Sequence, residues 1–224
     1  MNHCPDCLFM KLSAKPISSA RSLQWRKVIK QIELNLTLNF NEQWETLTVG
    51  RIKFGIRGGE LRLTVDNGKI SDSDRALTDH TLCLSLPIKS QKTVVDKTGN
   101  TDLELGSKNN RKNQDQCKYS LLQTTVKGTQ ESPVWLFEEK TGEQVLRGTI
   151  QDQKLAIVTV EGKPCLIDAI FKITEHDVYI CDGEGLWSPD LNCNKLAIVE
   201  KHLIRYLFNA KLKPYLSRQK LRYE

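Results

Sequence analysis

IELNLTLNF, at Ile32–Phe40, alternates apolar and polar residues without a break. Successive side chains of a β-strand point to opposite faces, so this stretch predicts a strand with one buried face and one solvated face. The same period of two recurs downstream at Leu47–Ile56, Leu61–Val65 and Leu82–Leu86. The first half of the chain therefore favours β-structure.

Two features between these strands predict antiparallel neighbours. The apolar pattern changes phase between Val49 and Ile52, which is typical of a β-bulge, and we place that bulge at residues 50–51. The Asn-Gly pair at 67–68 is typical of a type I′ hairpin, because both central positions need a positive φ. We therefore expect three consecutive antiparallel strands between Ile32 and this hairpin.

Six further runs with strand character occupy the second half of the chain: Tyr119–Val126, Val134–Glu139, Glu143–Ile150, Leu155–Val160, Pro164–Ile173 and Val178–Cys181. About nine strands at hairpin spacing, without alternating helices, disfavour a parallel β-α-β sheet. The predicted fold class is mainly β: an antiparallel β-sandwich of about nine strands, with a short N-terminal helix and a C-terminal amphipathic helix.

We expect three parts along the chain. Residues 1–30 form an N-terminal arm with the short helix, and residues 31–188 form the β-sandwich domain. Residues 189–224 form the C-terminal helix and a basic tail. Within the sandwich domain, the polar residues around 89–116 predict a mobile insertion, because they bury too little apolar surface to offset the entropy of ordering.

The C-terminal helix is predicted to begin near Asn194 and to end before Pro214. Apolar residues recur there at three- and four-residue steps and should pack on the sandwich: Leu196, Val199, Leu203, Leu207 and Ala210. The opposite face carries basic residues: Lys195, Lys201, Arg205 and Lys211.

Positive charge gathers at the C-terminus. Residues 195–224 include eight lysines or arginines and two glutamates, so this segment alone matches the net charge of +6 of the whole chain. Such a segment either folds onto the acidic middle of the chain or remains available to a polyanion or an acidic partner. No apolar run approaches the roughly 18 residues of a membrane helix, and no secretory signal opens the chain, so we expect a soluble cytoplasmic protein without membrane contacts.

Motifs of catalysis are scarce. The sequence has no dinucleotide-binding glycine motif, no phosphate-binding loop and no nucleophile elbow, and its four histidines have no metal-ligand spacing. Glu138 and Lys140 match the Glu-x-Lys pair of metal-dependent nucleases, in which the carboxylate holds a divalent cation and the lysine polarises water. The same spacing is typical of exposed charges at a hairpin end. We predict no catalytic residue and no cofactor.

Cys4 and Cys7 have the two-residue gap of a zinc half-site, but no second ligand pair follows. We therefore expect two reduced thiols on a frayed N-terminus and no bound metal. The loop Asp182–Asp190 contains Trp187 among glycines and carboxylates. It is either a recognition loop or a structural turn that plugs one end of the sandwich.

The leading interpretation is a non-catalytic interaction or assembly module that binds a protein partner through the last helix and the basic tail. The alternative is a nucleic-acid-binding protein that binds RNA or DNA with the same tail, in which tyrosines alternate with basic residues. A metal-dependent nuclease is the third interpretation. The predicted binding residues are Lys201, Arg205, Tyr206, Lys211, Lys213, Tyr215, Arg218, Lys220, Arg222 and Trp187.

Overall fold

The computed structural model describes residues 4, 6–17, 30–78, 80–85, 119–186 and 193–224. Within these ranges the chain is mostly β-strand with one α-helix near the C-terminus, which confirms the predicted mainly β fold class with antiparallel sheets and a C-terminal helix. The strands are β1 (Leu8–Ile17), β2 (Lys30–Phe40), β3 (Gln43–Leu47), β4 (Gly50–Ile56), β5 (Gly58–Asp66), β6 (Gly68–Lys69), β7 (His80–Ser85), β8 (Tyr119–Gly128), β9 (Pro133–Glu139), β10 (Gly148–Val160), β11 (Cys165–Lys172), β12 (Val178–Glu184) and β13 (Ser217–Tyr223). The helix is α1 (Cys193–Leu207), which continues as a π-helical segment at Phe208–Leu212.

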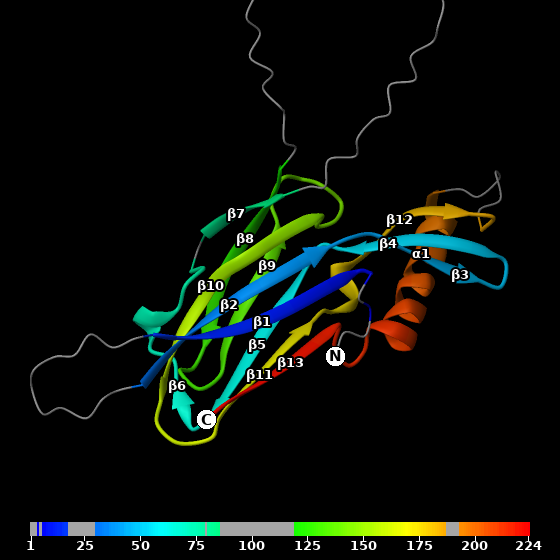
Figure 1. Cartoon of the computed structure of the whole chain (residues 1–224). Coiled ribbons are helices and arrows are strands. Elements are labelled where there is room, and N and C mark those ends of the chain that lie inside the picture. Colours follow the sequence, from blue (N-terminus) through cyan, green and yellow to red (C-terminus); the bar gives the residue numbers. More distant parts are fainter. Residues whose placement is uncertain (1–3, 5, 18–29, 79, 86–118, 187–192) are drawn as a thin grey trace, which may run out of the picture.

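Nine strands follow one another around a large, curved sheet in the order β1-β2-β10-β7-β8-β9-β5-β11-β13, and β6 pairs with β10 beside this path. Every neighbouring pair along the path is antiparallel. The sheet curls until its two edge strands, β1 and β13, lie side by side (Figure 1). The large sheet therefore forms a nearly closed barrel around one core.

Aromatic side chains fill much of that core. Phe171 of β11 packs against Phe40 of β2, with 6.1 Å between ring centroids, and against Phe137 of β9, with 5.7 Å. Trp135 is fully buried, and its indole N–H donates to the carbonyl oxygen of Ala76 at 2.9 Å, so its polar atom stays paired. Each fully buried side chain of this size contributes about 1.5–3 kcal/mol, which holds strands distant in sequence together.

A second, three-stranded sheet in the order β12-β4-β3 extends from one end of the barrel, and α1 lies beside it (Figure 1). The chain passes from β4 of this small sheet into β5 of the large sheet at Arg57, whose guanidinium lies 4.3 Å from the centre of the Tyr179 ring. The predicted run of three consecutive antiparallel strands is therefore wrong, because the second and third strands belong to different sheets.

The predicted β-bulge at residues 50–51 is a hairpin turn instead. β3 and β4 pair antiparallel up to Leu47 and Gly50, so the chain reverses at residues 48–49. Val49 at the tip is 72% exposed, which explains the change of phase, since a loop residue belongs to neither face of the strands. Asn67 adopts the expected positive φ of 60°, but β6 behind it pairs with β10, so this turn does not close a hairpin.

The N-terminal arm contains a strand that the sequence did not lead us to expect. β1 pairs with β2 along its whole length, and Leu8, Met10 and Leu12 enter the core. These three residues have the period of two that marked other strands. The predicted N-terminal helix, around Ala20–Lys30, lies outside the described ranges except for Lys30, which belongs to β2. The predicted insertion at 89–116 also lies outside the described ranges.

The last part of the chain returns to the large sheet. Of the predicted apolar stripe, Leu207 is buried and Leu203 is partly buried against the core. Leu196 and Val199 are only half-buried outside the core, and Ala210 is exposed. Behind Pro214, β13 pairs antiparallel with β11, from Ser217 to Tyr223. The segment expected as a basic tail is therefore largely an edge strand of the barrel.

Candidate interaction surface

The C-terminal residues predicted to bind a partner lie in two separate places. Those on α1, beside the small sheet, are Lys201, Arg205 and Tyr206. Those on β13, which ends at the opposite end of the barrel (Figure 1), are Arg218, Lys220 and Arg222. The segment between them carries Lys211, Lys213 and Tyr215. Trp187 lies outside the described ranges. The structure therefore does not gather the predicted residues into one patch.

The outer face of α1 mixes apolar and basic side chains. Ile198 is 59% exposed and Tyr206 is 54% exposed, just over two helical turns apart. Arg205 lies 3.7 Å from a carboxylate oxygen of Glu175, in an exposed ion pair. No described residue forms an ion pair with Lys201.

Several basic residues beyond α1 already have partners. Lys211 lies 2.5 Å from Glu45 of β3, and Lys213 donates to the side chain of Asn209 at 2.8 Å. The first contact joins the π-helical segment to β3, and the second lies within that segment and its C-terminal cap. Partly exposed pairs of this kind contribute under about 1 kcal/mol each.

Arg218 binds the neighbouring strand in the large sheet. Its guanidinium forms a two-pronged contact with Asp168 of β11, in which Nε lies 2.9 Å from Oδ1. Tyr215 also contacts Arg218. Arg222 pairs with Glu224 at 3.2 Å, whereas no described residue forms an ion pair with Lys220. The basic side chain of β13 that is most available to a partner is therefore Lys220.

The open boundary between β1 and β13, which we call the seam, is the place where the barrel fails to close. The side-chain amide of Gln219 on β13 donates to the carbonyl oxygen of Met10 on β1 at 3.2 Å. No ladder of backbone hydrogen bonds joins the described residues of β1 to those of β13. Each of the two strands is therefore an edge of the large sheet. Toward the C-terminal end of β13 the two strands diverge (Figure 1).

Alternate residues of β1 direct their backbone groups into the seam. The carbonyl oxygen of Cys7 accepts the amide of Asn41 at 3.0 Å, so odd-numbered residues of this segment face β2. Even-numbered residues face the other way, as the outward carbonyl of Met10 confirms. By this alternation the backbone groups of Leu12 and Ala14 also point into the seam, and no described residue hydrogen-bonds to them.

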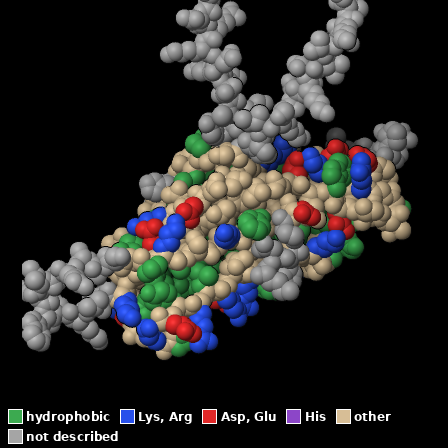
Figure 2. All heavy atoms as spheres, viewed as in Figure 1, with side chains coloured by type: hydrophobic (Ala, Val, Ile, Leu, Met, Phe, Trp, Pro, Cys, Tyr) green, Lys and Arg blue, Asp and Glu red, His purple; other side chains and the backbone are tan. Residues whose placement is uncertain are grey.

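The surface over the seam combines apolar and basic groups. Figure 2 shows apolar side chains gathered between β1 and the C-terminal half of β13, with lysines and arginines at the border. Leu221 and Tyr223 of β13 are only partly buried against the core. On the outer face, Lys11 of β1 and Lys220 of β13 are exposed. Sequence reasoning missed the β1 side of this surface, although the alternation of Leu8, Met10 and Leu12 could have indicated an edge strand.

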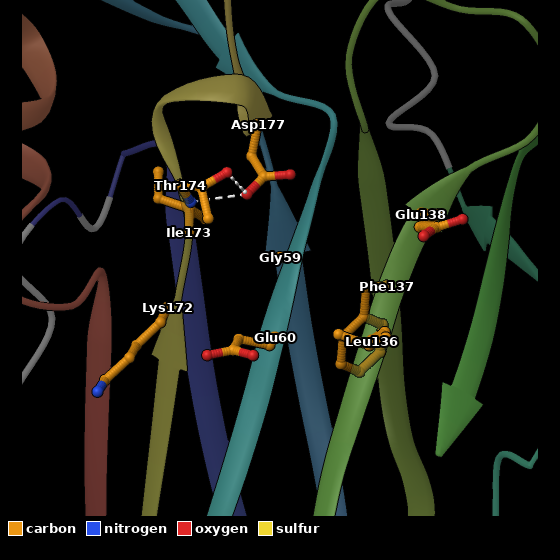
Figure 3. A pocket seen from close by; sticks show the side chains of 9 residues that line it. All are labelled: Gly59, Glu60, Leu136, Phe137, Glu138, Lys172, Ile173, Thr174 and Asp177. Atoms are coloured by element: carbon orange, nitrogen blue, oxygen red, sulfur yellow. Dashed lines mark hydrogen bonds between the residues drawn. The ribbon is translucent and has the colours of Figure 1, made fainter. Parts of the chain in front are cut away.

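The Glu138–Lys140 pair, considered as a nuclease motif, lies beside a pocket of about 200 Å³ (Figure 3). β5, β9 and β11 frame this pocket, and Gly59 and Glu60 of β5 line it. Lys140 lies 3.7 Å from Glu138 in an exposed ion pair, as expected for charges at a hairpin end.

Two other carboxylates of the pocket, Asp177 and Glu60, have structural partners. The carboxylate of Asp177 accepts the backbone amide of Thr174 at 2.7 Å and its hydroxyl at 2.8 Å, which closes a short 3-10 turn (Figure 3). Glu60 lies 2.9 Å from Arg62. Among the described residues no three His, Cys, Asp or Glu side chains are placed to hold a metal ion. The pocket therefore presents three carboxylates that already have partners, together with the amine of Lys172, and no described histidine or cysteine lines it.

The described part of the loop behind β12 also has a structural arrangement. Glu184 forms a two-pronged contact with Arg51, with Nε and Oε2 2.7 Å apart, and Arg51 lies 4.6 Å from the centre of the Trp44 ring. Asp182 accepts the amide of Gly183 at 2.7 Å. These carboxylates therefore do not converge on a common point.

Cys4 and Cys7 are not on a frayed terminus, and that prediction is wrong. Both side chains are buried, because the turn that carries them lies against the small sheet and the core. The thiol of Cys4 donates to the side-chain oxygen of Gln43 on β3 at 2.8 Å.

Comparison with protein-family models and with curated proteins finds no match for this chain. None of the helices in the described ranges has the length and apolar character needed to cross a bilayer.

Proposed function

We propose that this protein is a non-catalytic binding module, and that its seam holds an extended acidic segment of a protein partner. The observation that carries the proposal is an open sheet edge whose backbone groups, at Leu12 and Ala14, point toward a second edge. Unpaired strand edges are templates for an added strand.

The number of strands favours an added strand over simple closure. Along an antiparallel path of nine strands, the first and last strands run in the same direction. Direct closure of β1 onto β13 would therefore be parallel, which is slightly less stable per residue than antiparallel pairing. A tenth strand that runs opposite to both edges would pair antiparallel on each side. Paired strands lie about 4.8 Å apart, so a strand between β1 and β13 needs a gap of about twice that spacing. Such a segment therefore enters where β1 and β13 diverge.

The charge around the seam favours an acidic segment. Lys11 and Lys220 flank it on the outer face, whereas Lys15 of β1 is already paired with Asp152 at 2.8 Å. Lysines on an edge strand oppose pairing with a second copy of the same edge, because like charges would meet. Glutamate or aspartate at alternate positions of a partner strand would face these lysines, while apolar residues between them would cover Leu221 and Tyr223.

The test uses a fluorescein-labelled peptide of alternating glutamate and valine with the full chain, and fluorescence anisotropy as the readout. We expect saturable, salt-sensitive binding, and we expect a lysine-valine peptide of equal length to bind far more weakly. Hydrogen exchange should show new protection of the amides of Leu12 and Ala14 when the acidic peptide is bound.

The matched variants are Lys220→Glu and Lys127→Glu, which make the same charge change on β13 and on the exposed surface of β8. Lys220→Glu should weaken binding about threefold to tenfold, because it removes an exposed ion pair worth roughly 0.2–1 kcal/mol and adds a repulsion of similar size. Equal affinities for the two variants would refute the proposed site. A single-stranded oligouridine that binds while the acidic peptide does not would favour the nucleic-acid interpretation instead.

A further inference from the structure

A tight turn places the two N-terminal thiols next to each other. The carbonyl oxygen of Cys4 accepts the backbone amide of Cys7 at 3.1 Å and that of Leu8 at 3.0 Å. This turn brings the thiols of Cys4 and Cys7 close together, so that each influences the ionisation of the other. Both cysteines are free, so the arrangement is a reduced dithiol.

The two thiols have different surroundings. Lys211 lies on the side of Cys4 and its charge favours a thiolate there, while Asp6 and the hydrogen bond that the thiol donates to Gln43 oppose it. Cys7 is enclosed more deeply and has Cys181 as its other titratable neighbour. Cys4 is therefore better placed to hold a negative charge.

The ionisation of the pair follows from these contacts. The hydrogen bond from Cys7 lowers the pKa of Cys4 below the ordinary value for a thiol, against the effect of burial. The same hydrogen bond, together with burial, raises the pKa of Cys7 well above that value. Cys4 thus reacts first as a thiolate, and Cys7 keeps its proton until a second step.

We propose that Cys4 and Cys7 form a redox site that a small hydroperoxide oxidises reversibly to an intramolecular disulfide. The inference is independent of partner binding at the seam. Only 3% of Cys4 is exposed, which selects a small oxidant over a protein disulfide.

The chemistry balances in two steps. The Cys4 thiolate attacks the O–O bond of the hydroperoxide, an S–O bond forms, and the departing oxygen leaves as water or an alcohol after it takes a proton. The Cys7 sulfur then attacks Sγ of Cys4, an S–S bond forms, the S–O bond breaks, and hydroxide leaves with the proton of Cys7 as water. Two electrons pass from the thiols to the peroxide, and a dithiol reductant returns them.

The zinc half-site interpretation has less support. A closed structural zinc site needs four ligands, and the described residues provide no set of three His, Cys, Asp or Glu side chains around this turn. A two-thiol unit with one thiolate and one proton donor has instead the composition of a redox pair.

The test is peptide mass spectrometry of the full chain. Trypsin releases both cysteines in one peptide, Met1–Lys11, which contains no other cysteine. The reduced protein is treated with hydrogen peroxide, the remaining thiols are alkylated, and the masses are compared with those of an untreated sample. We expect this peptide to lose two hydrogens and both alkylation sites, and to regain them after treatment with dithiothreitol.

Other cysteines of the chain supply the controls. Cys165 is buried in β11 and should oxidise at least about tenfold more slowly, since burial raises its pKa. In Cys7→Ser the reaction should stop at the sulfenic acid of Cys4, which dimedone traps. The proposal is wrong if Met1–Lys11 keeps both thiols at a peroxide dose that already oxidises the exposed Cys83, or if Cys4 or Cys7 pairs with any other cysteine.

Discussion

Replacement of Leu207 by alanine tests whether the C-terminal helix is an integral part of the fold. Leu207 is the last residue of α1 and is fully buried in the common core. Removing its three outer carbon atoms loses their transfer free energy and leaves a cavity, which together cost about 2–5 kcal/mol for a buried leucine. Because a domain is stable by only about 5–15 kcal/mol, this variant should show a large shift of the urea unfolding midpoint.

Two further positions on the same helix give a graded control. Leu203→Ala should cost about 1–2 kcal/mol, because this side chain is only partly buried. Arg205→Ala should cost under about 1 kcal/mol, since it removes only an exposed ion pair with Glu175. If Leu207→Ala costs no more than Arg205→Ala at an unchanged denaturant dependence, the helix is not packed as described and this reasoning fails.

Two other substitutions test the barrel. Gly59→Ala should destabilise by about 1–3 kcal/mol, because the added Cβ would lie 2.6 Å from a ring carbon of the buried Phe171; an unchanged thermal midpoint would contradict this. Burial raises the pKa of Glu42, but Lys53 and Arg147 outweigh this effect and lower the pKa below its ordinary value. The charged carboxylate therefore stabilises the fold at neutral pH. This contribution disappears as the pH falls through the lowered pKa. Glu42→Gln should therefore be less stable than the wild type in urea at pH 7 and equally stable near pH 3, whereas a constant difference at both pH values would show that another contact is responsible.

The sequence by itself indicated most of the strands and which side of each of them is buried. Ile32–Phe40 is a strand with an apolar inner face, as its alternation predicts, and the stripe that includes Leu203 and Leu207 packs inward. These features are local, because the side-chain period of a strand or helix follows from its backbone geometry alone. The β1 strand had the same signal and was overlooked.

Strand pairing was decided only by the tertiary structure. Backbone hydrogen bonds between strands are alike for nearly all residues, so alternation does not reveal which strand lies next to which. β4 and β5 are adjacent in sequence and enter different sheets, whereas β11 joins β5 and β13 from distant parts of the chain. The strand character of β13 was also difficult to predict from the sequence. Ser217 and Gln219 occupy the same face as Leu221 and Tyr223, which weakens the apolar alternation.

The two candidate sites depend on this long-range arrangement. The seam exists because the first and last strands of the chain, β1 and β13, meet as the two unpaired edges of one sheet. The spacing of Cys4 and Cys7 was visible in the sequence, but their burial required the small sheet and Lys211, some two hundred residues away. Local backbone geometry depends on residues that are neighbours in the chain. The burial and the electrostatic surroundings of a side chain instead result from packing of the whole fold.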